Sequence, residues 1–341
     1  GTMFAPPHLM DDVDGVQAQI ARNMLDSGDW ITPQLNGIVD FEKPPMLYWM
    51  IGASYTLFGV SDWAARLPVV LSAILLCCLV ARIGAWAFGA TAGTLAGLCL
   101  ATSVGLFLFS RVLFHDVPLT LALTLGMWGA LRSLDPNELQ PKRWGLVFWA
   151  CCGVGILIKG LIAIVLPVGT LLLYLAVTGA LAKRCTWHRL RPGLGLFLVL
   201  LIAAPWHIVA TLRHPPYFDF TLQTAPGHYR GFFWFYFINE HVLRFLNLRY
   251  PRDYTSIPPA TFLLLHLVWL FPWSAYLPTL MRLSYRGEER SVRVRLFALC
   301  WVGLVIGFFC ISTTLEYYSL PAYPAVSLLI GSALASTPAT T

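Results

Sequence analysis

Residues 144–181 read WGLVFWACCGVGILIKGLIAIVLPVGTLLLYLAVTGAL, a long apolar stretch that carries one charged residue. That residue is Lys159, and Gly160 follows it. A membrane helix needs about 20 consecutive apolar residues, so two arrangements are open. The stretch forms either one long tilted span or two spans, at 144–158 and 161–181. The choice decides on which side of a membrane every other loop of the chain lies.

The whole chain has the composition of an integral membrane protein. Hydrophobic residues make up 57% of its 341 residues and charged residues 12%, whereas soluble domains carry about 25% charged residues. The apolar runs predict an all-α integral membrane protein with about nine transmembrane helices and short interfacial helices in its external loops. The runs lie at about 66–88, 91–110, 117–134, 144–158, 161–181, 192–212, 259–281, 296–312 and 319–336.

The distribution of charge favours two spans, one on each side of Lys159-Gly160. With that arrangement, 13 basic and four acidic residues lie on one side of the membrane, and ten basic and 13 acidic residues lie on the other. Cytoplasmic loops carry an excess of Lys and Arg, so the first side is predicted to be cytoplasmic. The loops 135–143, 182–191 and 282–295 are then cytoplasmic, and the aromatic-rich loop 213–258 is external.

A polar segment precedes the first apolar run. We predict that residues 1–65 form an external juxtamembrane segment with interfacial helices, and that 66–336 form the multispanning domain. The segment begins with the acids Asp11-Asp12-Val13-Asp14. Asp12 or Asp14 could act as a general base if its surroundings raise its pKa. The structural alternative is that Asp14 caps a helix, with Gln17 completing a capping box.

The same segment also contains a basic residue at a predicted helix start. Proline is tolerated in the first turn of a helix, so a second helix is expected to begin at Pro44-Pro45. Lys43 directly precedes it, where the helix dipole and unbonded amides favour an anion. Glu42 stands beside this lysine.

Further polar residues lie at the predicted ends of spans on the external side. Lys159 would cost about 2.5–3.5 kcal/mol in the middle of a bilayer, so it should face a cavity or reach the interface. Asp116 is a further candidate base where a span re-enters the membrane. Tyr317 and Tyr318 follow the last external loop, where tyrosine pairs are usually interfacial anchors.

The external loop 213–258 contains a compact polar group. Glu240, His241 and Arg244 lie within one helical turn and are expected to share a face. Arg244 is suited to binding a phosphate, because a guanidinium matches phosphate geometry. Glu240 and His241 could bind a metal, although two adjacent ligands are a weak signal.

Together these segments resemble the multispanning (GT-C) membrane glycosyltransferases that use lipid-phosphate-linked sugars. That class includes bacterial aminoarabinose transferases and protein O-mannosyltransferases. The resemblance covers nearly the whole chain, from Asp11 to about Gly331. In chain order the matching segments are IARNMLDSGDW (20–30), FEKPPMLYW (41–49), ARLP (65–68), DVPLT (116–120), IKG (158–160), EHVLRF (240–245) and YYSLP (317–321).

The resemblance implies roles for particular residues. The lysine and arginine that contact the carrier phosphate in the family match Lys43 and Arg244. The family's first-loop Asp-Glu pair falls on Val13 and Asp14, so Asp12 is considered in place of the displaced aspartate. The predicted site comprises the candidate bases Asp12, Asp14 and Asp116, the phosphate-binding candidates Lys43, Lys159, Arg244, Tyr317 and Tyr318, and the neighbouring Glu42, Glu240 and His241.

Two positions depart from the family pattern. A tyrosine often found two residues before the Glu of Glu-Lys-Pro is Asp40 here, and a basic residue often found before Glu-Tyr-Tyr is Thr314. Both changes alter the phosphate pocket and could shift the sugar or the acceptor. The family's first span and its C-terminal part have no counterpart, so we expect this chain to be a fragment that lacks both.

The resulting hypothesis is a multi-pass glycosyltransferase of the bacterial inner (plasma) membrane with its active site on the periplasmic or extracellular side. It would transfer a sugar from a polyprenyl-phosphate carrier to a lipid, glycan or protein acceptor. The expected partners are this donor and membrane lipid, with no nucleic acid and no nucleotide, since no dinucleotide-binding fingerprint is present. The sequence indicates no particular cofactor, and it leaves open whether a divalent metal binds.

Two alternatives remain at this stage. A polytopic transporter or flippase for a lipid-linked glycan would place charged residues inside its spans, near the midplane. A non-catalytic lipid-binding subunit would need the phosphate-binding cations but not the acids.

Overall fold

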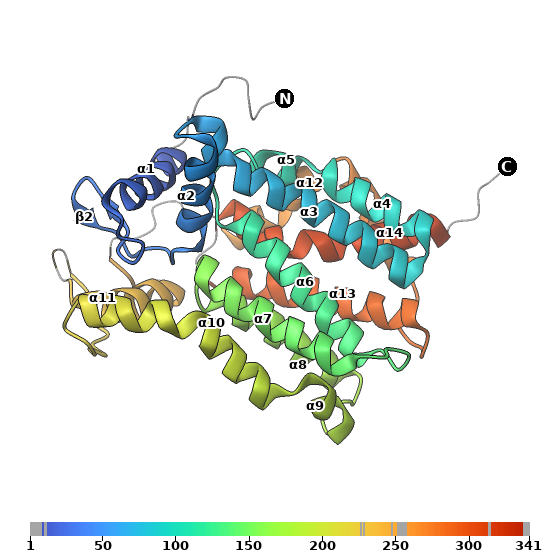
Figure 1. Cartoon of the computed structure of the whole chain (residues 1–341). Helices are drawn as coiled ribbons and strands as arrows, with labels where there is room; N and C mark the ends of the chain where they lie inside the picture. Colours follow the sequence, from blue (N-terminus) through green and yellow to red (C-terminus); the bar gives the residue numbers. More distant parts are fainter. Residues whose placement is uncertain are drawn as a thin grey trace.

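The computed structural model describes residues 9, 12–225, 227, 229–246, 248–250, 258–312 and 315–336. Asp11 and Thr314 lie outside this part of the chain. Long helices run side by side, and a smaller group of short elements gathers at one end of them (Figure 1). The elements are α1 (Asp12–Ser27), β1 (Gln34–Leu35), β2 (Ile38–Val39), α2 (Met46–Phe58), α3 (Asp62–Phe88), α4 (Ala90–Ala101), α5 (Val104–Phe109), α6 (Asp116–Leu134), α7 (Pro141–Lys159), α8 (Ile162–Val177), α9 (Arg184–Leu190), α10 (Pro192–Arg213), α11 (Gly231–Phe233), the π-helix η1 (Trp234–Leu243), α12 (Pro259–Trp269), the 3₁₀ helix η2 (Trp273–Arg282), α13 (Arg290–Ile311), the 3₁₀ helix η3 (Glu316–Ala322) and α14 (Tyr323–Ser336).

The predicted helical membrane fold is confirmed, but the number of nine spans is not. In the described ranges, six helical segments are long and apolar enough to cross a membrane: α3, α6, α7, α9 with α10, α13, and η3 with α14. A seventh results if α12 and η2, which are bent by 104°, form one span. The apolar helices α4 and α8 are shorter. The count of nine therefore stays a prediction, because an apolar run does not reveal where a helix breaks.

One small sheet departs from the all-helical expectation. Strands β1 and β2 pair antiparallel, with Gln34 opposite Val39 and Leu35 opposite Ile38. Asn36 and Gly37 form the turn between them, both with positive φ, as a two-residue hairpin turn of this kind requires. The hairpin lies beside α1 at the end of the molecule where α2 and α11 also lie (Figure 1).

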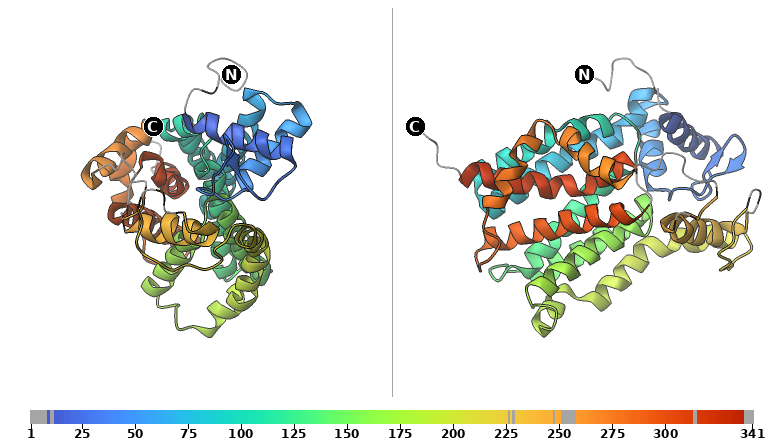
Figure 2. Two further views of the ribbon diagram at one scale, coloured as in Figure 1. Left: turned by 90° about the vertical axis from the view of Figure 1, so that its left-hand side faces the viewer. Right: turned by 180° about the vertical axis from the view of Figure 1, so that it is seen from behind.

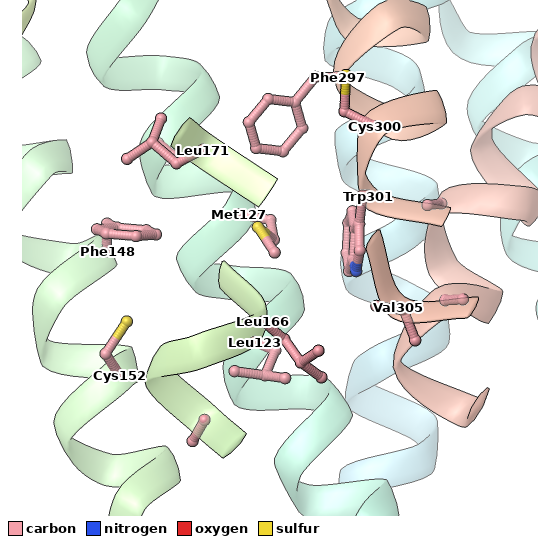
Figure 3. Packing of buried hydrophobic residues seen from close by; sticks show 14 of the residues in the cluster. Leu123, Met127, Phe148, Cys152, Leu166, Leu171, Phe297, Cys300, Trp301 and Val305 are labelled. Atoms are coloured by element: carbon pink, nitrogen blue, oxygen red, sulfur yellow. The ribbon is translucent and has the colours of Figure 1, made fainter. Parts of the chain in front are cut away.

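A continuous apolar core joins α6, α7, α8 and α13. Figure 3 shows side chains from these helices pointing toward one another, including Met127, Phe148, Leu166 and Trp301. Each of these four is at most 2% exposed. Such close packing matters in a membrane, where lipid tails are as apolar as the side chains and contact between helices drives association.

Helices α3 and α4 approach each other closely at small residues. A Cβ added to Gly93 would lie 2.4 Å from the backbone oxygen of Ala81 and 2.4 Å from the backbone nitrogen of Ala85. Only glycine fits such a contact, which is the small-residue helix packing typical of membrane bundles. Helix α3 also runs through the predicted domain boundary between residues 65 and 66.

The interruption at Lys159-Gly160 separates two helices, as predicted. Helix α7 ends at Lys159, Gly160 has φ of 84°, and α8 begins at Ile162. The left-handed conformation is accessible to glycine at little cost, so Gly160 can end α7 and let the chain turn back. The C-terminal end of α7 lies toward the end of the bundle that carries α1 and α2, on the left in Figure 1 and on the right in the second panel of Figure 2.

Candidate functional site

A cavity of about 470 Å³ opens at the end of the bundle near α1 and α2. Segments far apart in the sequence meet around it: the chain before α2, the start of α6, the break between α7 and α8, η1, the end of α13 and η3. Both ionisable and apolar side chains line it. We call the ionisable lining residues the charged wall; they include Glu42, Lys43, Asp116, Lys159, Glu240 and Arg244. We call the apolar lining residues the apolar wall; they include Leu161, Ile162, Val165, Val242, Phe245, Phe308 and Phe309.

Lys159 and Asp116 form the deepest ion pair of the charged wall. Lys159 is the last residue of α7 and Asp116 is the first residue of α6, and their Nζ and Oδ1 atoms lie 2.5 Å apart. The Lys159 side chain is 13% exposed and the Asp116 side chain 3% exposed. The lysine ammonium also lies over the ring of Tyr318, 4.3 Å from its centroid. The pair and the aromatic face together compensate the charge that the sequence placed in an apolar stretch.

Arg244 connects three segments of the cavity wall. Its Nη1 lies 3.0 Å from Oε2 of Glu240, one helical turn earlier, and 3.5 Å from Oε1 of Glu42. Its Nη2 donates to the Tyr318 hydroxyl at 3.0 Å. The predicted shared face of Glu240, His241 and Arg244 is therefore confirmed, since all three line the same cavity.

Glu240 is a buried carboxylate held between two arginines. Arg249 Nη1 donates to its two oxygens at 2.7 and 2.6 Å, opposite the contact with Arg244. Burial raises the pKa of Glu240, and the positive charges of Arg249 and Arg244 act in the opposite direction.

Glu42 and Lys43 enter the cavity from the loop before α2. Lys43 Nζ lies 2.9 Å from Oε1 of Glu42. The adjacent Lys43 ammonium holds the pKa of Glu42 well below its ordinary range, against the effect of burial. Asp40, which replaces the family tyrosine, accepts a hydrogen bond from the Glu42 backbone N–H at 2.9 Å. Burial raises the pKa of Asp40, and its carboxylate shapes the loop that carries Lys43.

His241 is held as a neutral imidazole by two backbone contacts. Its Nε2 accepts the Leu161 N–H at 3.1 Å, so its Nδ1 carries the proton and donates to the Tyr236 carbonyl at 2.6 Å. Burial lowers the pKa of His241 to about 4. A Cβ at Gly160 would lie 2.3 Å from His241 Nε2, so the glycine is also needed for this contact. The predicted pairing of His241 with Glu240 as metal ligands is not favoured by this geometry, because both ring nitrogens are engaged.

Within the described ranges, no group of three or more His, Cys, Asp or Glu residues is arranged to hold a metal ion. Of the two predicted tyrosines, Tyr318 lines the cavity and Tyr317 does not. Tyr317 stacks on Phe114 with a centroid distance of 4.0 Å and lies 5.4 Å from the Lys159 ammonium. The ammonium lies over this ring, so Tyr317 adds a second cation–π contact to Lys159.

Asp12 and Asp14, the first-loop candidates for the base, are not among the residues that line the cavity. Helix α1 begins at Asp12, so the prediction that Asp14 caps this helix is wrong. Asp14 is 2% exposed, accepts the Leu113 N–H at 2.6 Å and lies 3.5 Å from Nη2 of Arg66. It fixes the chain just before Asp116. Asp12 is exposed at the start of the helix.

Sequence reasoning missed Arg249 and the apolar wall. Arg249 follows the recognised EHVLRF segment by only four residues, and this closeness was the available signal. The apolar wall was not predictable as a unit, because its residues come from α8, η1, α13 and the chain next to them. They are indistinguishable in sequence from residues that face lipid.

The chain is similar in sequence to a known protein family and to curated proteins. Residues 42–209 match the family described as dolichyl-phosphate-mannose-protein mannosyltransferase. The undecaprenyl phosphate-alpha-4-amino-4-deoxy-L-arabinose arabinosyl transferase of Pectobacterium atrosepticum is 32% identical over 92% of this chain and 53% of its own length. The chain thus spans about half the length of the curated relatives it matches.

Solved structures agree in fold. The crystal structure of ArnT from Cupriavidus metallidurans bound to undecaprenyl phosphate superposes with a TM-score of 0.84 at 31% identity, covering 97% of this chain and 57% of that one. The Archaeoglobus fulgidus oligosaccharyltransferase has a TM-score of 0.63 at 14% identity, covering 97% of this chain and 46% of that one, and shares the fold alone. By sequence and by fold, the chain therefore belongs to the GT-C family of multispanning membrane glycosyltransferases.

Proposed function

We propose that this chain carries the lipid-donor site of a glycosyltransferase that takes its sugar from a polyprenyl-phosphate carrier. The single observation that carries the proposal is that one cavity is lined both by three cations and by many apolar side chains. A polyprenyl phosphate has the matching chemistry, an anionic head on an apolar chain. The head would lie against Lys43, Lys159 and Arg244, and the first prenyl units against Val165, Phe245 and Phe308.

The relatives support the choice of carrier. The curated relatives are named as undecaprenyl phosphate-linked aminoarabinose transferases, and the ArnT structure contains undecaprenyl phosphate. The sugar and acceptor of this chain are not fixed by those names, because the chain spans about half of each relative. A lipid, a glycan or a protein hydroxyl would serve as the acceptor.

The chemistry needs a leaving-group site and a base. The acceptor oxygen attacks the anomeric carbon, the bond from that carbon to the phosphate oxygen breaks, and the lipid phosphate leaves with the electron pair. Cations stabilise the charge that develops on the departing phosphate. The acceptor proton passes to a base. Asp116 is the candidate base that the cavity favours. The first-loop alternatives are the exposed Asp12 and the buried Asp14.

We propose further that the cavity faces the periplasmic or extracellular side of the bacterial inner membrane. The support is the charge distribution of the predicted nine-span arrangement, which puts 13 basic residues and four acidic ones on the opposite side. Cysteines introduced at Arg230 and Arg286 test this in intact cells with an impermeant thiol reagent. Labelling is expected at position 230 and not at 286, and the reverse result would overturn the orientation.

The donor site is tested by measuring the Kd for undecaprenyl phosphate of the purified chain in detergent. Lys43→Ala and Arg244→Ala should each weaken binding by roughly 10- to 100-fold, because charge-assisted contacts are worth about 1.5–3 kcal/mol. Arg230→Ala is the matched control, since Arg230 pairs with Asp219 and is not among the cavity residues. Absence of binding by the unmodified chain, or unchanged affinity in both cavity variants, would contradict the proposal.

A further inference from the structure

Arg249 is a largely buried cation that contacts Glu240, one of the residues of the charged wall. Its side chain is 10% exposed, and it is not one of the residues that line the cavity. Its Nη1 lies within hydrogen-bond distance of both oxygens of Glu240, whose side chain is 3% exposed. Glu240 in turn contacts Arg244 on its other side. The three residues thus form a chain of charges that ends in the cavity.

The backbone next to Arg249 is fixed to η1. The Tyr250 N–H donates to Asn239 Oδ1 at 3.4 Å, and Asn239 Nδ2 donates to the Tyr250 carbonyl at 3.1 Å. Asn239 directly precedes Glu240 and is fully buried. The Asn239 side chain holds the Tyr250 backbone, and the neighbouring Glu240 and Arg249 are joined through their side chains. The position of Arg249 relative to Glu240 is therefore defined.

The energetic consequence concerns Arg244. Charges attract more strongly in a buried site than in water, so the Glu240 carboxylate draws the nearest cations toward itself. Because Arg249 contacts both oxygens of Glu240, its positive charge compensates the negative charge of that carboxylate. The second nitrogen of Arg244 can then point to Tyr318 and the cavity. If Glu240 had Arg244 as its main counter-ion, the guanidinium would be drawn back and its charge would be less available to a bound anion.

We propose that Arg249 is a positioning residue for donor binding, which neutralises Glu240 and so keeps the Arg244 guanidinium directed at the phosphate of the lipid donor. This inference rests on the proposed function, because it takes the anion at Arg244 to be the carrier phosphate. Arg249 itself makes no contact with the donor.

A double-mutant cycle with undecaprenyl phosphate as the probe tests the inference. Arg249→Gln should weaken the Kd about tenfold, equivalent to about 1.4 kcal/mol. Glu240→Gln added to this variant should bring the Kd back toward the wild-type value, because the carboxylate that retracts Arg244 has been removed. Arg249→Lys keeps the charge and should recover most of the affinity. Arg230→Gln, which removes an arginine paired outside the cavity, is the control and should bind as the wild type does.

The possible outcomes separate this inference from the proposed function. If wild type and Arg249→Gln bind equally well, the inference is wrong and the donor site stands. If the wild type does not bind, both are wrong. A double variant as weak as Arg249→Gln would indicate a general structural role and overturn the inference. If Arg249→Gln does not fold, the double variant alone decides. Near-wild-type affinity of the double variant for undecaprenyl phosphate supports the positioning role of Arg249, and a tenfold loss contradicts it.

Discussion

The two ends of helix α6 each hold a buried aspartate in an ion pair, yet only one end opens on a cavity. At the first end, Asp116 pairs with Lys159 beside about 470 Å³ of space. At the second end, Asp135 pairs with Arg290 Nε at 2.8 Å and Arg293 Nη2 at 3.4 Å, and the adjoining space is about 10 Å³. That space would hold about one water molecule at most.

The groups around Asp135 satisfy one another. The Asp135 carbonyl accepts from Arg189 at 2.9 Å. Arg132 lies 2.5 Å from Glu138 and has three tryptophan rings around it, the nearest with its centroid at 4.5 Å. A buried aspartate paired with basic residues is therefore closely packed at one end of α6 and adjoins a cavity at the other. A paired charge in an apolar bundle does not by itself indicate function. What distinguishes the candidate site is the cavity beside its ion pair.

The largest expected difference between the two ends is in catalysis. Asp116→Asn should lower the rate of sugar transfer by about 10²–10⁴-fold, the usual contribution of a positioned base. Asp135→Asn should leave the transfer rate of the folded protein close to the wild-type value. The comparison is made in membranes containing each full-length enzyme with its natural donor. Transfer by Asp116→Asn at the wild-type rate would move the base to another residue, with Asp12 first.

Asp14 sharpens the comparison, because it lies near the Asp116 end but outside the cavity. Asp14→Asn keeps an acceptor for the Leu113 N–H and removes the negative charge that faces Arg66. Breaking a buried ion pair in this way costs about 3–5 kcal/mol, and the 3.5 Å separation places the expected loss near the lower value. Thermal unfolding in detergent would measure it. A variant that stays as stable as wild type but loses transfer would restore Asp14 as the base.

The smallest expected effect is at the Asp135 end. Asp135→Asn should reduce the free energy of unfolding by about 1–3 kcal/mol, the range for hydrogen bonds to charged groups. The loss is smaller than for Asp14, because Arg290 and Arg293 are 37% and 26% exposed and water can replace part of their contact. The Kd for undecaprenyl phosphate should not change. A weaker Kd in this variant would mean that the two ends of α6 are coupled.

The sequence by itself determined the class of the protein and the places along the chain where ionisable side chains gather. Hydrophobic length and charge asymmetry are local properties, so they predicted the membrane helices, the break at Lys159-Gly160 and the placement of ionisable groups at helix ends. The EHVLRF segment predicted a shared face because residues one turn apart meet on any helix. The family resemblance singled out Lys43 and Arg244, and both line the cavity.

Only the tertiary structure decided which acids face the cavity and which hold the fold together. Asp14 and Leu113 are 99 residues apart, and Arg244 and Glu42 are 202 apart, so no local pattern reports their contact. The bend between α12 and η2 and the apolar wall likewise depend on neighbouring helices. The physical reason is that hydrophobicity and helix periodicity act within one segment, whereas the direction and partner of a charged side chain depend on which distant segment packs beside it.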